Sequence, residues 1–329
     1  MLYPLLFEAN LFPIIWGGDR LIALKGMPPV DVPIGESWEI SAVIGKESVV
    51  ANGVLKGKNL RDLSFEYGAE LLGRSVYERY GSELPVLVKF IDTQNDLSIQ
   101  VHPDDAVALS RHGCMGKTEM WYVVDAKPGA FLYAGFSRDI TIEEYRRMVG
   151  DGSICQVLAK HYINKGDAFL IPAGLVHALC SGAFVVEVQQ SSDITYRLYD
   201  YNRIGMDGKP RQLHTALAEG VLDLSCHTDC SVHYPRLDNE SNLICSNRHF
   251  NVSLLPLDKS VRRDMRRYDS FVAYTCISGS CIIGNSVHLQ QGFSTLIPAS
   301  CADVNIVPTG IGGKVELMEV FIDCACNGQ

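Results

Sequence analysis

The sequence predicts a mainly β protein made of two β-barrels of the jelly-roll type, with a helical insertion in the N-terminal part. The first observation is a turn that occurs twice, because residues 166–177 (GDAFLIPAGLVH) are matched by residues 292–303 (GFSTLIPASCAD). The second is the run of short strands and turns from about residue 240 onward. The third is the length of 329 residues, which favours about two domains. We therefore expect one domain over residues 1–235 and a second over residues 236–329.

We expect residues 1–50 to be extended and interrupted by Gly and Pro, with an exposed turn at Trp16-Gly17-Gly18. Residues 59–80 have the apolar spacing of a helix. We expect strands over residues 86–92 and 97–102. Residues 98–102 alternate along the second of these, so Gln100 and His102 point from the same face.

Pro103-Asp104-Asp105 is typical of a helix start with an acidic N-cap. Glu119 opens an apolar strand, and residues 141–148 begin the helical insertion. Residues 166–177 form a strand that ends in a Pro/Gly turn and then His177. We expect a further helix over residues 211–222, packed outside the barrel.

Four side chains are the candidate metal ligands: Gln100, His102, Glu119 and His177. One amide oxygen, one carboxylate and two imidazoles suit a borderline divalent ion such as zinc and leave room for water or substrate. The second copy of the turn has Asp303 in place of His177, and no His-x-His or Gln-x-His precedes it. We therefore expect one metal ion per chain, in the first barrel. The alternative is a barrel that kept the turn and binds a ligand without metal.

The composition excludes several classes of protein. A net charge of -9 argues against non-specific binding to nucleic acid, although a local basic cluster could still hold a phosphate. We find no signal peptide and no apolar run long enough to span a membrane, so a cytoplasmic location is expected. The odd count of 11 cysteines fits reduced thiols better than a disulfide framework. Cys226, His227, Cys230 and His233 form a weaker zinc candidate, and Cys324 and Cys326 are interpreted as part of a frayed end.

Gly-x5-Pro-x-Gly-x2-His at residues 166–177 is similar to the second signature of the cupin fold, and Gln100-x-His102 with Glu119 resembles the first. A more specific resemblance rests on segments in family order: Trp16-Gly17-Gly18, 36–39, 97–104, 117–120, 171–177 and 187–197. They resemble the type I mannose-6-phosphate isomerases (phosphomannose isomerases) of the short bacterial form. The resemblance covers roughly residues 1–225, and the remainder only as a cupin-like tail.

The resemblance implies a zinc-dependent aldose–ketose isomerase that interconverts mannose 6-phosphate and fructose 6-phosphate through a cis-enediol(ate). It assigns the metal to Gln100, His102, Glu119 and His177, and catalytic roles to Arg197, Lys117, Glu187, Lys89 and Asp193. It makes residues 1–235 the metal-binding catalytic domain and residues 236–329 a barrel without metal ligands. One departure is the absence of a histidine after Trp38, where larger members carry one.

We expect Ser98, Lys117 and Trp16 to contact the substrate, with Ser98 and Lys117 as candidates for the phosphate. Simpler roles exist for three of these site residues. Glu187 could point outward, Arg197 could form a surface salt bridge with Asp193 or Asp200, and Lys89 could belong to a structural ion pair. Two other functions stay open, namely an iron-dependent cupin oxygenase and a non-catalytic sugar-phosphate-binding protein. No glycine-rich phosphate loop is present, so a nucleotide cofactor is not expected.

Overall fold

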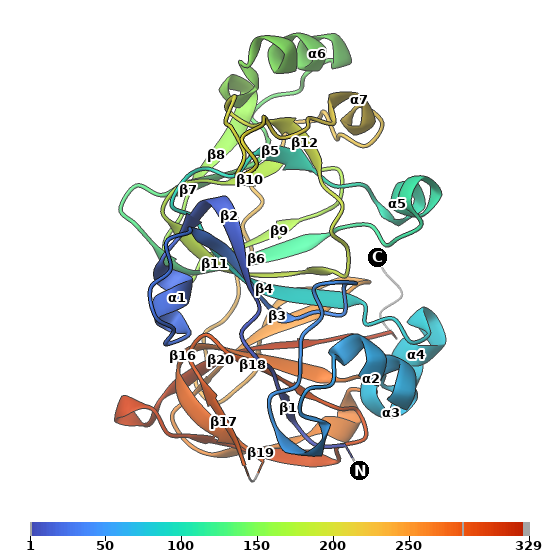
Figure 1. Ribbon diagram of the computed structural model, residues 1–329, viewed down its shortest axis with the longest axis vertical. Helices are drawn as coiled ribbons and strands as arrows, with labels where there is room; N and C mark the ends of the chain where they lie inside the picture. Colours follow the sequence, from blue (N-terminus) through green and yellow to red (C-terminus); the bar gives the residue numbers. More distant parts are fainter. Residues whose placement is uncertain (1, 285, 325–329) are drawn as a thin grey trace.

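The computed structural model describes residues 2–284 and 286–324, and its strands form antiparallel sheets. Figure 1 shows two of these sheets in the upper part of the molecule and the C-terminal strands in the lower part. The prediction of a mainly β protein is confirmed, and the arrangement is consistent with a cupin-like fold. Cys326 lies outside the described residues.

A six-stranded sheet forms the middle layer, and its strand β4 shows why this sheet is buried on both faces. Val88 and Phe90 share one apolar cluster with residues of the C-terminal sheet, whereas Ile91 belongs to a second cluster on the opposite side. Lys89 therefore points to the side of Ile91, away from the C-terminal sheet. In order across the sheet, the strands are β2 (Leu11–Gly18), β3 (Ile34–Ile40), β4 (Val86–Asp92), β11 (Ala183–Gln190), β6 (Glu119–Ala126) and β9 (Ala168–Ile171).

A five-stranded sheet packs against the free face of the middle layer. Leu132 and Leu179 from this sheet join Trp121 and Val185 from the six-stranded sheet in one buried cluster. Polar side chains at the end of this layer therefore face one another from both sheets. In order, the strands are β12 (Tyr196–Tyr199), β5 (Ile99–Val101), β10 (His177–Leu179), β7 (Phe131–Phe136) and β8 (Leu158–Tyr162).

The C-terminal strands form a nine-stranded sheet that also takes up β1 (Leu5–Leu6), which pairs with β18. Lys25 Nζ lies 2.6 Å from Glu39 Oε1, and it also donates to the carbonyl of Gly292, so a hydrogen bond from this buried ion pair joins the two parts. The remaining strands are β13 (Asn242–Ser246), β14 (Asn251–Leu257), β15 (Val261–Asp264), β16 (Val272–Ile283), β17 (Val287–Gln290), β18 (Ser294–Ile297), β19 (Asp303–Pro308) and β20 (Val315–Phe321).

The predicted helix over residues 59–80 is present as three short helices: α2 (Leu60–Tyr67), α3 (Ala69–Leu72) and α4 (Arg74–Tyr80). Gly68 and Gly73 separate them with φ angles of 48° and 95°, a backbone region that favours glycine. The helix after Asp104 is α5 (Asp105–His112), and the Asp104 side chain accepts the Val107 N–H as an N-cap. Residues 142–151 form α6 (Ile142–Asp151), which begins with a capping box at Thr141.

Three expectations differ from the structure. Trp16 is 3% exposed within β2 instead of lying in an exposed turn, because its ring packs in the cluster between the two upper sheets. The first 50 residues include a short helix, α1 (Arg20–Leu24). The helix expected over residues 211–222 is a single turn, α7 (Thr215–Ala218), which packs with α6 on the outer face of the five-stranded sheet (Figure 1).

No helix in the described residues is long and apolar enough to cross a membrane.

Candidate active site

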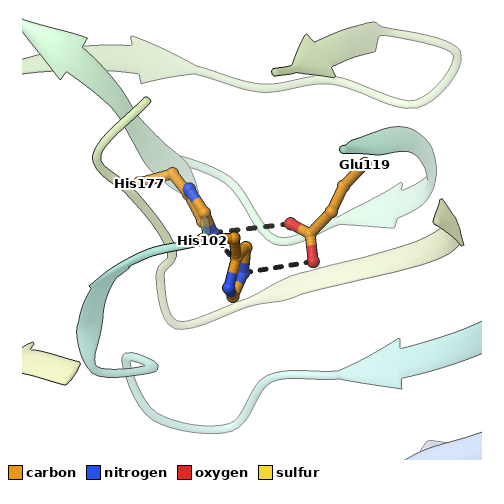
Figure 2. Close-up of side chains that lie close together, drawn as sticks. All are labelled: His102, Glu119 and His177. Carbon is orange, nitrogen blue, oxygen red and sulfur yellow. Dashed lines mark hydrogen bonds and ion pairs between the residues drawn. The ribbon is translucent and has the colours of Figure 1, made fainter. Parts of the chain in front are cut away.

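His102, Glu119 and His177 converge at one end of the two upper sheets, and all three are buried (Figure 2). His102 follows β5, Glu119 opens β6 and His177 opens β10. His102 Nε2 lies 3.3 Å from Glu119 Oε1, and His177 Nε2 lies 3.4 Å from Glu119 Oε2. Among the described residues, this is the single group of three His, Cys, Asp or Glu side chains close enough to share an ion.

The orientation of the two imidazoles is fixed by backbone carbonyls. His102 Nδ1 lies 2.9 Å from the Ile194 carbonyl, and His177 Nδ1 lies 2.8 Å from the Leu175 carbonyl. A carbonyl only accepts hydrogen bonds, so each Nδ1 carries the proton and each Nε2 presents a lone pair. The two Nε2 atoms are 3.1 Å apart. Two lone pairs at that distance repel one another, and a cation that both could bind would remove the repulsion. Histidine ligands of metals commonly donate their other N–H to a carbonyl in this way.

Glu119 supplies a second reason to place a cation here. Both of its carboxylate oxygens are buried and accept no hydrogen bond, although Lys117 Nζ lies 2.9 Å from Oε1. Burial by itself would raise the pKa of Glu119, but Lys117 and His102 hold it well below its usual value. Burial and the charge of Lys117 lower the pKa of His102 to about 3. The carboxylate is therefore ionised and the imidazole neutral, which are the protonation states that ligate metals.

Gln100 is the fourth predicted ligand, and the sheet register brings it to this group. Gln100 pairs with His177 on one side and with Arg197 on the other. Two imidazole nitrogens, a carboxylate and a neighbouring amide fit a borderline divalent ion.

A cavity of about 320 Å³ adjoins this group between the two upper sheets. Its volume suits a small polar ligand. All the predicted site residues outside the three-residue group line its wall: Trp16, Lys89, Ser98, Gln100, Lys117, Glu187, Asp193 and Arg197.

Lys89 and Glu187 form a buried cross-strand pair in this wall, directly opposite each other on β4 and β11. Lys89 Nζ lies 3.3 Å from Glu187 Oε1, and the Trp121 indole donates to Glu187 Oε2 at 2.8 Å. Burial and the charge of Glu119 raise the pKa of Glu187. Burial acts to lower the pKa of Lys89, but Glu36 and Glu187 outweigh it and raise the pKa above its usual value. Glu187 thus points inward, and Lys89 combines an ion pair with a place in the cavity wall.

Arg197 enters the cavity from β12 without a carboxylate partner among the described residues. Its Nε donates to Ser98 Oγ at 3.2 Å, and its Nη1 donates to the Gln212 carbonyl at 2.9 Å. Asp193 instead pairs with Lys46, and Asp200 pairs with Arg203 and Arg211. The surface salt bridge considered for Arg197 is therefore not formed.

Sequence reasoning missed five polar residues of the cavity wall: Glu36, Lys46, Thr195, Arg211 and His214. Alternation along the segment Glu36-Ser37-Trp38 could have indicated that Glu36 shares a face with Trp38, whose indole donates to it at 2.6 Å. Lys46, Arg211 and His214 lie in loops or beside a one-turn helix, where no periodic pattern indicates direction.

The second zinc candidate, Cys226, His227, Cys230 and His233, does not form a possible metal group among the described residues. His227 Nε2 lies 2.7 Å from Asp223 Oδ2, which gives that imidazole an ordinary acidic partner. Asp303, which stands where His177 stands in the first turn, pairs with Arg262 and is one-third exposed.

Known proteins share both the sequence and this architecture. The model of the phosphomannose isomerase type I catalytic domain matches residues 7–129. The mannose-6-phosphate isomerase of Streptococcus mutans is 35% identical over 300 residues, which cover 91% of this chain and 93% of that protein. Mannose-6-phosphate isomerase ManA of Bacillus subtilis is 33% identical over 301 residues, or 90% of this chain and 93% of that protein.

Solved structures agree with the sequence comparisons. A crystal structure of the mannose 6-phosphate isomerase from Bacillus subtilis superimposes with a TM-score of 0.86 at 31% identity, over 97% of this chain and 99% of that one. A phosphomannose isomerase from Salmonella typhimurium, only 17% identical, has a TM-score of 0.77 over 98% of this chain and 100% of that one, so it shares the fold.

Proposed function

This chain belongs to the type I phosphomannose isomerase family, and we propose on that premise that it interconverts mannose 6-phosphate and fructose 6-phosphate. The observation that carries the proposal is that the candidate metal group lies next to a cavity lined by positively charged side chains. A buried group of two neutral imidazoles and an ionised carboxylate lies beside a cavity whose wall includes Lys89, Lys117 and Arg197. Isomerisation of a phosphorylated sugar needs both an electrophile at the reacting oxygens and fixed positive charge.

Zinc is the metal we propose, one ion per chain, held by Gln100, His102, Glu119 and His177. The support is the donor set of nitrogen and oxygen ligands and the absence of a redox step in the reaction. Once bound, the ion would act as a Lewis acid that polarises the sugar carbonyl.

The chain's own residues would supply the proton and charge chemistry. Arg197 Nη2 has no hydrogen-bond partner among the described residues, and we assign this guanidinium to the oxygen that gains charge in the enediolate. Lys117, 2.9 Å from Glu119, would contribute a second positive charge at the metal end.

We assign Glu187 as the general acid–base catalyst, because burial and the charge of Glu119 raise its pKa toward the range in which proton transfer is effective. Lys89 balances its charge when it is ionised. Asp193, paired with Lys46 at 2.6 Å, would close the mouth of the cavity.

The finer fold is part of the same proposal. Residues 1–235 would form a cupin-like catalytic barrel with helical insertions, and residues 236–329 a second barrel without metal ligands. The pairing of Asp303 with Arg262 supports this division. Asp303 replaces the histidine in the second turn, and its carboxylate is engaged by Arg262. The described cysteines are free thiols, which supports a cytoplasmic location.

The test is a coupled assay of mannose 6-phosphate conversion to fructose 6-phosphate, before and after chelation, with elemental analysis of the protein. We expect turnover that stops on chelation and returns with zinc. Activity that needs oxygen and iron would identify an oxygenase instead. Binding of mannose 6-phosphate without turnover by metal-loaded protein would identify a sugar-phosphate-binding protein.

A further inference from the structure

Three arginines lie near one carboxylate, Asp200, beside the cavity, and two of them bind it. Asp200 is buried, and it accepts hydrogen bonds from Arg203 Nη2 at 2.6 Å and from Arg211 Nε at 2.7 Å. Arg197, the third guanidinium, is close enough for Arg211 to lower its pKa after the larger effect of burial. The hydrogen bonds of Arg197 go to a hydroxyl and a backbone carbonyl, which carry no negative charge. The cluster therefore has an excess of positive charge that an anion would balance.

The two arginines held by Asp200 point to different places. Arg203 Nη1 donates to the carbonyl of Asp96, and Arg203 lines a separate hollow with Asn95 and Tyr201. Arg211 lines the cavity that also contains Gln100, Lys117 and Arg197. Its Nε and Nη2 are bound to Asp200, so Nη1 is the donor that has no hydrogen-bond partner within the described residues.

The order of these groups along the cavity matches the order of the reacting carbons and the phosphate in a phosphorylated sugar. Gln100 is the cross-strand neighbour of Arg197, which ties Arg197 to the metal end. Arg197 in turn donates to the carbonyl of Gln212, the residue that follows Arg211. Along β12, Tyr196 pairs with Val101 beside His102, whereas Tyr199 pairs with Ile99. Asp200 follows Tyr199, so Asp200 and the Arg211 bound to it lie beyond Arg197 on the side away from His102, as the phosphate of a hexose 6-phosphate lies far from carbons 1 and 2.

We propose that Arg211, held in place by Asp200, binds the phosphate of the substrate and makes the site specific for phosphorylated hexoses. This inference rests on the proposed function for the identity of the sugar. Phosphate carries nearly two negative charges at neutral pH, and a guanidinium offers it parallel donors.

The two residues first considered for the phosphate have other contacts. Lys117 Nζ lies 2.9 Å from Glu119 and 3.3 Å from His102 Nε2, so it belongs to the metal end. Ser98 Oγ accepts from Arg197 and thereby orients that guanidinium. These contacts favour Lys117 for the reacting oxygens and Ser98 for positioning.

The experiment compares R211M with R203M, because both substitutions remove one of the two arginines of Asp200 but only Arg211 lines the cavity. Calorimetry on metal-loaded protein measures binding of fructose 6-phosphate, fructose and inorganic phosphate. We expect R211M to weaken binding of fructose 6-phosphate and phosphate about 10- to 100-fold, the loss of one charged hydrogen bond, and to leave fructose unchanged. R203M should stay within about threefold of the unmodified protein for all three ligands.

Unchanged phosphate binding in R211M would overturn the proposal, and so would equal losses in R211M and R203M, which would show that Arg211 only supports the fold. If R211M does not fold, arginine labelling of the unmodified protein with phenylglyoxal replaces it. Fructose 6-phosphate should then protect Arg211 and leave Arg203 reactive, and equal protection of both would contradict the assignment. A protein that binds phosphate through Arg211 but does not turn over the sugar would overturn the proposed function alone.

Discussion

Replacing Arg197 with methionine should reduce kcat about a hundredfold while metal content and fold stay nearly intact. The side chain makes two hydrogen bonds, to Ser98 Oγ at 3.2 Å and to the Gln212 carbonyl at 2.9 Å, and both acceptors are neutral. Hydrogen bonds of this kind contribute about 1 kcal/mol each to stability, so the folded state should lose about 2 kcal/mol. Methionine keeps most of the apolar stem, which limits the loss of packing.

The kinetic effect should be larger than the structural one because it concerns charge that appears only in the transition state. Removing one fixed donor from a developing oxyanion costs roughly 3 kcal/mol, which corresponds to about a hundredfold in rate. The substrate in its ground state carries no such charge at the reacting oxygen, so KM should change by less than about fivefold.

The assay is steady-state kinetics with a coupled readout, combined with zinc analysis and thermal unfolding of the same preparations. S98A is the matched variant, because it removes one support of the guanidinium but keeps its charge, and its kcat should fall less than about tenfold. A loss of thermal stability in R197M with kcat unchanged would refute the reasoning and assign Arg197 a structural role.

H177A should lose bound metal and activity together, whereas H233A, which changes a histidine outside the metal group, should keep both; full activity in metal-free H177A would contradict the site. Metal-free protein should lose stability as the pH falls below about 6.5. The reason is that the folded state holds the pKa of His102 at about 3, so the unfolded state binds more protons over that range. Urea unfolding of chelated protein at pH 7 and pH 5 measures this, and equal stability at both would count against a neutral buried His102. D303A should leave zinc content and turnover within about twofold because Asp303 pairs with the exposed Arg262, and a large loss of activity in folded protein would assign the C-terminal part a catalytic role.

Local sequence signals predicted the elements that depend on neighbours in the chain. The strand expected over residues 86–92 matches β4, and the N-cap expected at Asp104 begins α5. The helix expected from residue 141 is α6, which the structure begins with a capping box at Thr141. These features depend on hydrogen bonds within about four residues, so the information lies in the segment itself. The Pro/Gly turn before His177 belongs to the same class, since Gly174 has a φ of 89°.

The group of His102, Glu119 and His177 could be predicted because these residues lie in motifs with characteristic spacing. The sequence alone could not show how the ligands are oriented. The carbonyls of Ile194 and Leu175 aim the two imidazole lone pairs at each other, and one of them is 92 residues away from the histidine it orients. Sequence patterns do not indicate such contacts, because the contacts depend on strand register and on where the loops fold.

By itself, the sequence determined the mainly β class, the repeated turn, the family and the three residues of the candidate metal group. Only the tertiary structure decided which side chains complete the cavity. Trp16 reads as an exposed turn residue but is buried because the five-stranded sheet covers β2. Arg211 and Lys46 lie in segments with no periodicity. Each is held at the cavity by an ion pair with a residue outside its own segment, Asp200 for Arg211 and Asp193 for Lys46. The physical reason is that a loop side chain takes its direction from long-range partners, whereas a strand or helix side chain takes it from the period of the backbone.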